Sequence, residues 1–141
     1  MSGLNRIIYI DDDHDDREIF EQVISEMDKK VMLVTSGMHF FDFIYDDFLA
    51  NSLIFVDLNL PKISGQEIII QLRKKFTPKQ LPIIVFSGLD DNEVVDQCYN
   101  CGANGFLKKT YSYVDLRKHI EDAVNKDWFR FETTRENFRL N

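Results

Sequence analysis

The stretch Ser52-Leu53-Ile54-Phe55-Val56-Asp57 is a run of apolar residues that ends abruptly on a carboxylate. Apolar, β-branched and aromatic residues without polar alternation are typical of a strand covered on both faces, as in a parallel sheet. Asp57 would then stand at the carboxyl end of a strand, where open α/β proteins place their sites. An aspartate here can instead cap the next turn, and this stretch alone does not separate the two interpretations.

Four further segments are predicted as strands, over residues 6–10, 31–35, 81–86 and 105–107. Apolar residues at intervals of three and four predict helices over 15–27, 40–49 and 68–76, then after Asn92 and again over 114–124. Strands and helices therefore alternate along the chain, which is the pattern of a doubly wound parallel sheet with helices on both faces.

The composition fits a single domain. A chain of 141 residues with 44% hydrophobic residues can bury one core, but it leaves no room for a second folded domain. The net charge of -7 argues against nucleic-acid binding, which needs a basic surface. We see neither a secretory signal nor an apolar run long enough to span a membrane, so we expect a cytoplasmic protein.

The two cysteines, Cys98 and Cys101, form a lone C-x-x-C motif. A zinc site would need a second pair or histidines at metal-binding spacing, and neither is present. We interpret them as reduced thiols on a helix, with a redox or zinc role as the alternative.

Acidic residues follow two of the predicted strands. Asp11 and Asp12 end the first strand and Asp57 ends the third, and a strand order of 2-1-3-4-5 would bring all three to one crevice. Carboxylates at that range raise one another's pKa unless a cation joins them. A few carboxylates with room for water suit Mg²⁺, whereas the glycine and closing glutamate of a calcium loop are missing.

The fourth and fifth strands add Ser87 and Lys109 to the same edge. A nucleophilic carboxylate, a metal ion, a hydroxyl donor and an ammonium are the groups that an acyl phosphate on Asp57 would require. The pattern therefore predicts phosphoryl transfer that depends on position and electrostatics.

Four sequence motifs together resemble the response-regulator receiver domain of two-component signalling, in its stand-alone chemotaxis-type form. They are Tyr9-Ile10-Asp11-Asp12-Asp13 with Arg17, Val56-Asp57-Leu58-Asn59-Leu60-Pro61 with Gly65, Phe86-Ser87-Gly88, and residues 102–109. The resemblance covers about residues 5–127 and implies a flavodoxin-like, five-stranded parallel sheet of order 2-1-3-4-5. Residues 128–141 are a carboxyl-terminal extension beyond it.

The resemblance implies that Asp57 accepts a phosphoryl group from a sensor histidine kinase or a histidine phosphotransfer protein. Asp12 and Asp57 would bind Mg²⁺ directly, the backbone carbonyl of Asn59 would be a third ligand, and Asp11 would act through water.

The same resemblance implies that Ser87 and Lys109 bond the phosphoryl oxygens and that Phe106 is an aromatic switch moving inward with the Ser87 hydroxyl. The output would be a protein that binds the face of the fourth helix, fifth strand and fifth helix. The chain would catalyse only its own phosphorylation and slow autodephosphorylation, so it is not expected to be an enzyme.

Other residues near the strand ends have simpler interpretations. Asp13 is predicted to cap the first helix, while Asp15 and Asp16 are predicted to be a solvated first turn. We assign His14 no catalytic role. Lys109 is preferred over Lys108 because of its spacing from Gly102 and the alternation of the strand.

One position departs from the family pattern. Thr110 follows Lys109 where the family usually has a proline after a cis bond, so the loop is either trans or strained. A phosphorylation-independent scaffold of the same fold is therefore kept as the alternative function. A phosphohydrolase with an aspartyl nucleophile is the third candidate, but it would need an acid where Asn59 stands.

The extension is rich in aromatic residues, among them Trp128, Phe129, Phe131 and Phe138. We expect it to continue the last helix or pack beside it. A partner-binding tail or a homodimer contact is the alternative.

Overall fold

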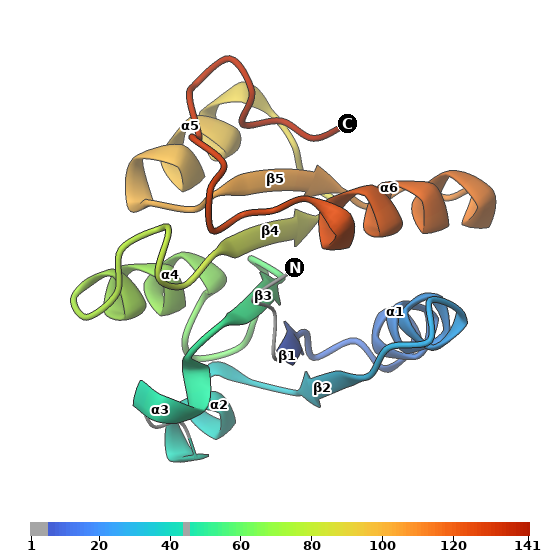
Figure 1. Cartoon of the computed structure of the whole chain (residues 1–141), viewed down its shortest axis with the longest axis horizontal. Helices are drawn as coiled ribbons and strands as arrows, with labels where there is room; N and C mark the ends of the chain where they lie inside the picture. The colour runs from blue at the N-terminus through green and yellow to red at the C-terminus, as the bar shows by residue number, and fades with distance from the viewer. Residues whose placement is uncertain (1–5, 44–45) are drawn as a thin grey trace.

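The computed structural model describes residues 6–43 and 46–141, and within them five parallel strands pair in the order β2-β1-β3-β4-β5. The predicted strand order and fold class are confirmed. The strands are β1 (Arg6–Ile10), β2 (Val31–Val34), β3 (Ser52–Val56), β4 (Ile83–Ser87) and β5 (Gly105–Lys108). The helices are α1 (His14–Glu26), α2 (Gly37–Phe43), α3 (Asp46–Leu49), α4 (Gly65–Arg73), α5 (Asn92–Cys101) and α6 (Tyr113–Asn125), and Figure 1 shows their arrangement.

The segment predicted as one helix over 40–49 is two short helices, α2 and α3. The predicted helical positions Ile44 and Tyr45 lie outside the described residues. Phe40 and Leu49, one on each short helix, are both buried, so the apolar spacing did mark residues that face the core. The fourth and fifth predicted helices are α5 and α6.

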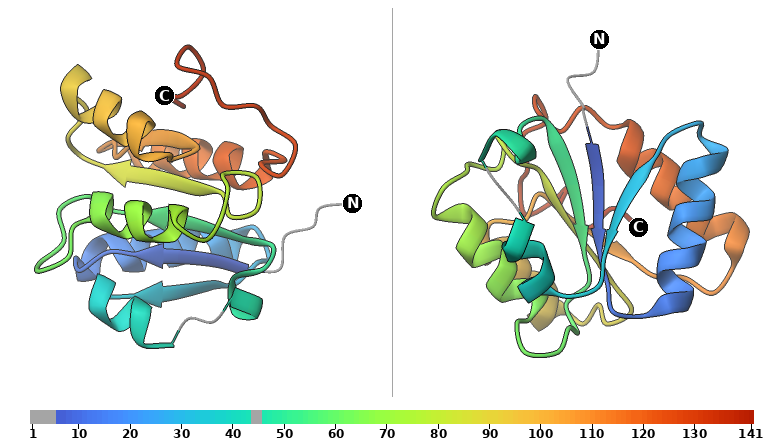
Figure 2. Two further views of the ribbon diagram at one scale, coloured as in Figure 1. Left: turned by 90° about the vertical axis from the view of Figure 1, so that its left-hand side faces the viewer. Right: turned by 90° about the horizontal axis from the view of Figure 1, so that it is seen from below.

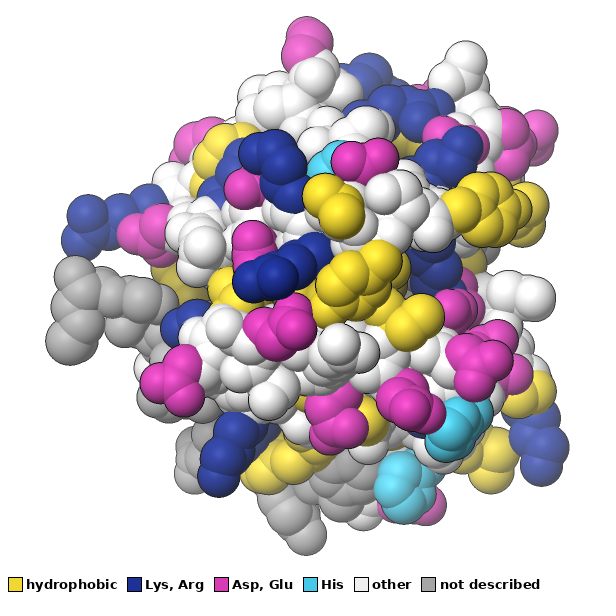
Figure 3. All heavy atoms as spheres, turned by 90° about the vertical axis from the view of Figure 1, so that its right-hand side faces the viewer, with side chains coloured by type: hydrophobic (Ala, Val, Ile, Leu, Met, Phe, Trp, Pro, Cys, Tyr) yellow, Lys and Arg dark blue, Asp and Glu magenta, His cyan; other side chains and the backbone are white. Residues whose placement is uncertain are grey.

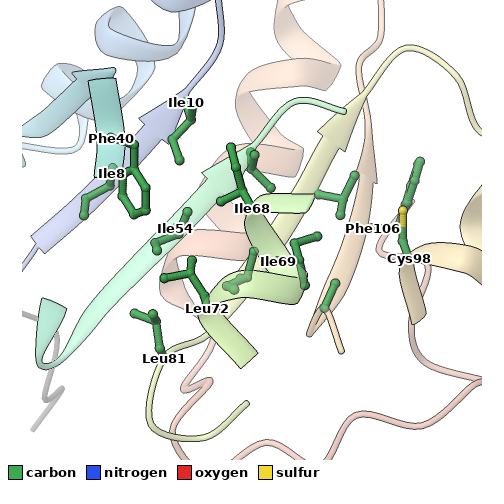
Figure 4. Packing of buried hydrophobic residues seen from close by; sticks show 14 of the residues in the cluster. Ile8, Ile10, Phe40, Ile54, Ile68, Ile69, Leu72, Leu81, Cys98 and Phe106 are labelled. Carbon is green, nitrogen blue, oxygen red and sulfur yellow. The ribbon is translucent and has the colours of Figure 1, made fainter. Parts of the chain in front are cut away.

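Helices cover both faces of the sheet, α1 and α6 on one side and α2, α4 and α5 on the other (Figure 2). Because side chains alternate along a strand, each strand contributes to two separate cores. Tyr9 and Phe55 pack with α1 and α6, whereas Ile8 and Ile54 pack toward α4. Figure 4 shows this second core, in which strand residues lie against Ile68, Ile69 and Leu72. Burial on both faces explains the unbroken apolar runs in the sequence.

Polar side chains set the starts of three helices. Asp13 caps α1 by accepting a hydrogen bond from the backbone N–H of Asp16 at 3.0 Å, as predicted. Ser64 and Ser112 cap α4 and α6 in the same way. These caps satisfy backbone donors that the helices cannot pair internally.

Residues 126–141 follow α6 and return across the sheet edge. Trp128 is buried, and its indole N–H donates to the carbonyl oxygen of Ala123 on α6 at 2.7 Å. The chain then runs beside α5 and β5, where Arg139 forms an isolated parallel bridge with Phe106 (Figure 1). The division of the chain into a receiver domain and an extension stays a prediction.

Gly65, the first residue of α4, lies directly against the backbone that carries Asp57. A Cβ atom at this position would stand 2.3 Å from the Asp57 carbonyl oxygen and 2.9 Å from the Leu58 Cα. Both contacts are with backbone, so they cannot be relieved by a side-chain rotation.

We therefore expect Gly65→Ala to lower the free energy of unfolding by about 1–3 kcal/mol, measured by urea denaturation. Gly88→Ala is the matched control, because an added Cβ there meets nothing within 4 Å. Equal stability of the two variants would contradict the proposed crowding.

Candidate functional site

Three predicted carboxylates meet at the carboxyl edge of β1 and β3. The backbone N–H of Asp57 donates to Ile10 and that of Asp11 donates to Val34, each at 3.0 Å, so the sheet pairing continues one residue past the strand ends. One oxygen each from Asp11, Asp12 and Asp57 lies within 4.8 Å of the others. Asp11 and Asp57 are buried and Asp12 is exposed, so the cluster has one side open to solvent.

Asp11 is held by three protein donors. The Tyr9 hydroxyl and the Lys109 ammonium both bond its Oδ2, the latter at 2.8 Å, and the backbone N–H of Asp13 bonds its Oδ1 at 2.9 Å. Arg17 donates to the Asp11 carbonyl oxygen at 2.9 Å. Both carboxylate oxygens of Asp11 therefore already have partners within the protein.

Lys109 brings a positive charge to the cluster from the end of β5. Its ammonium lies 2.8 Å from Asp11, 2.7 Å from Asp16 and 3.3 Å from Asp57. Burial alone lowers the pKa of Lys109, but hydrogen bonds to Asp11 and Asp16 and the charge of Asp57 leave it raised above its usual value. The ammonium is therefore charged throughout the physiological pH range.

The contact with Asp16 corrects the prediction for the first turn of α1. Asp15 is solvated, with 91% of its side chain exposed, but Asp16 is only 36% exposed and pairs with Lys109. No sequence spacing links these two residues, which lie 93 positions apart. The hydrogen bond that the Tyr9 hydroxyl donates to Asp11 was also not predicted from the sequence. The period of two in a strand places Tyr9 and Asp11 on the same side.

The pKa of the Asp57 carboxyl group lies above the ordinary value for an aspartate. Burial raises its pKa to about 6, the charge of Lys109 opposes that rise, and Asp11 adds to it. A backbone hydrogen bond from Asn59 also favours the charged form. The carboxylate is thus a desolvated anion held at the tip of a rigid strand.

Ser87 lies at the end of β4, next to the strand that carries Lys109. Its side chain is buried and its Oγ accepts a hydrogen bond from the backbone N–H of Leu89 at 3.1 Å. The backbone N–H of Lys109 donates to the Ser87 carbonyl oxygen at 2.8 Å. Phe106, which pairs with Val85 in the sheet, is also buried.

The loop after Lys109 is trans, since the described residues contain no cis peptide bond. The Thr110 hydroxyl is buried without a hydrogen-bond partner in the described part of the chain. Lys108 points elsewhere and pairs with Asp90 at 3.3 Å. The structure thus places Lys109, rather than Lys108, among the carboxylates.

The remaining candidates lie outside the cluster. His14 is exposed and lies 3.5 Å from Asp15. Cys98 is buried, and burial raises the pKa of its thiol to about 12, which disfavours a reactive thiolate.

Acidic, basic and hydrophobic side chains are mixed on the molecular face in Figure 3. Within the described residues, no helix is long and apolar enough to cross a membrane.

Comparison with known proteins gives a consistent result. Residues 7–121 match the family described as "Response regulator receiver domain". Response regulator Rcp1 of Synechocystis sp. is 25% identical over 134 residues, which cover 90% of each chain. Two-component response regulator ARR6 of Arabidopsis thaliana is 24% identical over 130 residues, covering 85% of this chain and 69% of that protein.

The fold is also found among solved structures. The crystal structure of the Mn(2+)-bound form of response regulator Rcp1 has a TM-score of 0.72 and is 21% identical. The similarity covers 92% of this chain and 99% of that one.

The raised pKa of Asp57 makes a prediction about stability. A carboxyl whose pKa is higher in the folded than in the unfolded chain stabilises the fold only while it is protonated, and this contribution is lost as the pH rises through the folded pKa. We expect Asp57→Asn to stabilise the metal-free chain by about 1–3 kcal/mol at about pH 8. The gain should shrink between the folded pKa of about 6 and the ordinary value of 3.8.

Urea denaturation at about pH 8 and about pH 4 measures this difference. Asp15→Asn is the control, since Asp15 is exposed and lies outside the cluster. A gain of the same size at both pH values would show that charge desolvation at Asp57 is not its cause.

Proposed function

Because this chain belongs to the response regulator receiver domain family, we propose that it is a signalling module switched by phosphorylation of Asp57. The donor would be a sensor histidine kinase or a histidine phosphotransfer protein. The observation that carries the proposal is the buried Asp57 carboxylate, which lies 3.3 Å from the Lys109 ammonium and within a cluster of three acids.

The same cluster suits Mg²⁺. Its donors are carboxylate oxygens, which hard divalent cations prefer, and one of the three acids is exposed, which leaves room for water ligands. Asp12 and Asp57 would bind the ion directly together with the backbone carbonyl of Asn59. Asp11 would act through water, because both of its oxygens already accept protein hydrogen bonds. When bound, the ion would offset the negative charge of the acids and of the incoming phosphoryl group.

The transfer would join an oxygen of Asp57 to phosphorus. The bond between phosphorus and the donor imidazole breaks, and the imidazole nitrogen keeps the electron pair and takes up a proton. Lys109 is already in contact with Asp57 and would pair with a phosphoryl oxygen, while the Ser87 hydroxyl would donate to another. Asp57 and Lys109 already contact each other from the ends of β3 and β5, so these two groups need little reorganisation.

Phosphorylation would be transmitted through Ser87 and Phe106. Drawing the Ser87 hydroxyl toward the phosphoryl group would break its bond with the Leu89 N–H and rearrange the start of the β4–α5 loop. Phe106 lies on the neighbouring strand and its ring is already buried, so the proposed switch would be a shift of this ring toward Ser87 within the core. The face of α5, β5 and α6 would then change its affinity for a downstream protein. A cytoplasmic location and the association state stay predictions.

A phosphorylation-independent scaffold is the alternative. It is favoured by Thr110, whose buried hydroxyl has no partner among the described residues where the family usually has proline. A phosphohydrolase is less well supported, because Asn59 offers an amide where such an enzyme needs an acid.

We expect incubation with acetyl phosphate and Mg²⁺ to add one phosphoryl group to the chain, detected by intact mass. Acetate is the leaving group in this reaction. Asp57→Asn should stay unmodified under the same conditions, and Asp15→Asn should be labelled like the wild type. Equal labelling of wild type and Asp57→Asn would refute the assignment of the acceptor.

Mg²⁺ binding distinguishes the proposed phosphorylation-controlled module from the phosphorylation-independent scaffold. We expect calorimetry to detect Mg²⁺ binding by the wild type and a loss of at least about tenfold in affinity for Asp12→Asn, because a charged carboxylate ligand is replaced by a neutral amide. Asp15→Asn controls for the loss of one negative charge near the site. Absence of Mg²⁺ binding by the wild type would favour the scaffold.

A further inference from the structure

Residues 133–141, here called the tail segment, add main-chain pairing to the edge of the sheet. The backbone N–H of Phe106 donates to the Phe138 carbonyl oxygen, and the backbone N–H of Leu140 donates to the Phe106 carbonyl oxygen, each at 2.9 Å. The amide of Asn141 continues the contact by bonding both the N–H and the carbonyl of Lys108, at 2.8 and 2.9 Å. The tail segment therefore occupies the edge of β5 as an added parallel strand would.

An aromatic side chain anchors this pairing. Phe138 is 1% exposed, and its ring centroid lies 5.4 Å from that of Tyr99 on α5 and 6.5 Å from that of Phe106. The tail segment thus packs directly on the ring that we propose as the switch.

Two arginines tie the tail segment to α5 and to the loop before it. Arg139 donates to the carbonyl oxygen of Asp90 at 2.8 Å and to the side chain of Asn92 at 2.9 Å. Arg135 lies 3.3 Å from Asp96, and its guanidinium lies over the Tyr99 ring. The tail segment therefore covers the face of α5 and β5 to which the proposed function assigns the downstream partner.

The contacts of Arg139 join the tail segment to the phosphorylation site. Asp90 and Asn92 lie in and just after the loop that leaves Ser87, and the Ser87 Oγ holds the start of that loop through the Leu89 N–H. If Ser87 turns toward a phosphoryl group, this bond is lost and the groups that hold Arg139 move. If the loop holds Arg139 in only one of its two arrangements, phosphorylation and binding of the tail segment would each weaken the other.

We propose that residues 138–141 are an intramolecular ligand of the β5 edge that phosphorylation of Asp57 releases. The uncovered edge then binds an extended segment of a partner protein in which an aromatic residue is followed by a basic one, as Phe138 is followed by Arg139. An unpaired strand edge and an aromatic pocket are what such a segment needs. This inference rests on the proposed function.

The first experiment tests whether the edge takes such a segment. The probe is a fluorescent peptide with the sequence of residues 133–141, titrated into the full-length chain and followed by anisotropy. In the wild type the attached tail segment competes at high effective concentration, so we expect weak binding. Arg139→Gln should bind the peptide at least about tenfold more tightly, because its own tail segment is held less well.

Phe138→Ala is a second variant that uncovers the same edge, and Arg130→Gln is the control. Arg130 is 89% exposed and contacts Asp127 rather than α5 or β5. Binding to Arg130→Gln should equal that of the wild type. Equal binding to all four chains would overturn the proposal.

The second experiment tests release by phosphorylation. Hydrogen exchange of the Leu140 and Phe106 amides is measured in the full-length chain with and without acetyl phosphate and Mg²⁺, and intact mass gives the phosphorylated fraction. We expect exchange at both amides to be at least about tenfold faster in the phosphorylated chain and unchanged in Asp57→Asn.

Two failures can be told apart. A phosphorylated chain with unchanged exchange at Leu140 would overturn this inference and leave the proposed function standing. A chain that stays unphosphorylated would overturn both.

Discussion

The register of β1 against β3 brings two buried carboxylates to the same level of the sheet. Ile10 pairs with Val56, so Asp11 and Asp57 leave adjacent strands side by side. Main-chain hydrogen bonds hold both residues in place. Neither residue's backbone can move away from the other unless hydrogen bonds between the strands break. Lys109 offsets the repulsion from the end of β5, two strands away from β3. Two other charged groups of the site, Lys109 and Asp12, lie around this pair of carboxylates.

The cluster remains negative after Lys109 is counted, because this ammonium contacts three carboxylates and Asp12 lies beside them. Burial of a carboxylate is costly, and it is the main cause of the raised pKa of Asp57, to which the charge of Asp11 adds and which Lys109 opposes. A divalent cation would relieve that cost, which explains how an unfavourable arrangement can serve a binding function. Asp16 adds a constraint, since Lys109 would have to share its ammonium between Asp16 and a phosphoryl group.

The edge of β5 poses a different physical problem. An edge strand exposes unpaired N–H and carbonyl groups that other chains can join. Here Phe138, Leu140 and Asn141 satisfy those groups from within the chain. The protection consists of a few hydrogen bonds, one buried ring and the contacts of Arg135 and Arg139, and the proposed partner would replace it with the same groups. Arg139, which lies between Phe138 and Leu140, contacts Asp90 and Asn92 in and just after the β4–α5 loop, and these contacts are the proposed link between the edge and Asp57.

Much of this protein follows from local sequence signals. Apolar runs over 53–56 and 81–86 predict buried parallel strands, and helical spacing predicts most of the helices, because both depend on which neighbouring residues must be buried. The residues at the strand ends, Asp11, Asp57, Ser87 and Lys109, were predicted to share one edge because parallel strands end on the same side. The helix cap at Asp13 was likewise predicted from a local sequence signal.

Contacts between distant residues could not be read in the same way. The pairing of Asp16 with Lys109 depends on how α1 packs beside the end of β5, and no periodicity in the chain encodes that angle. The bridge of Arg139 to Phe106 likewise depends on residues 126–141 folding back across a finished sheet edge. Local patterns record which side chains must be buried, whereas these contacts arise only when separately formed elements meet in space.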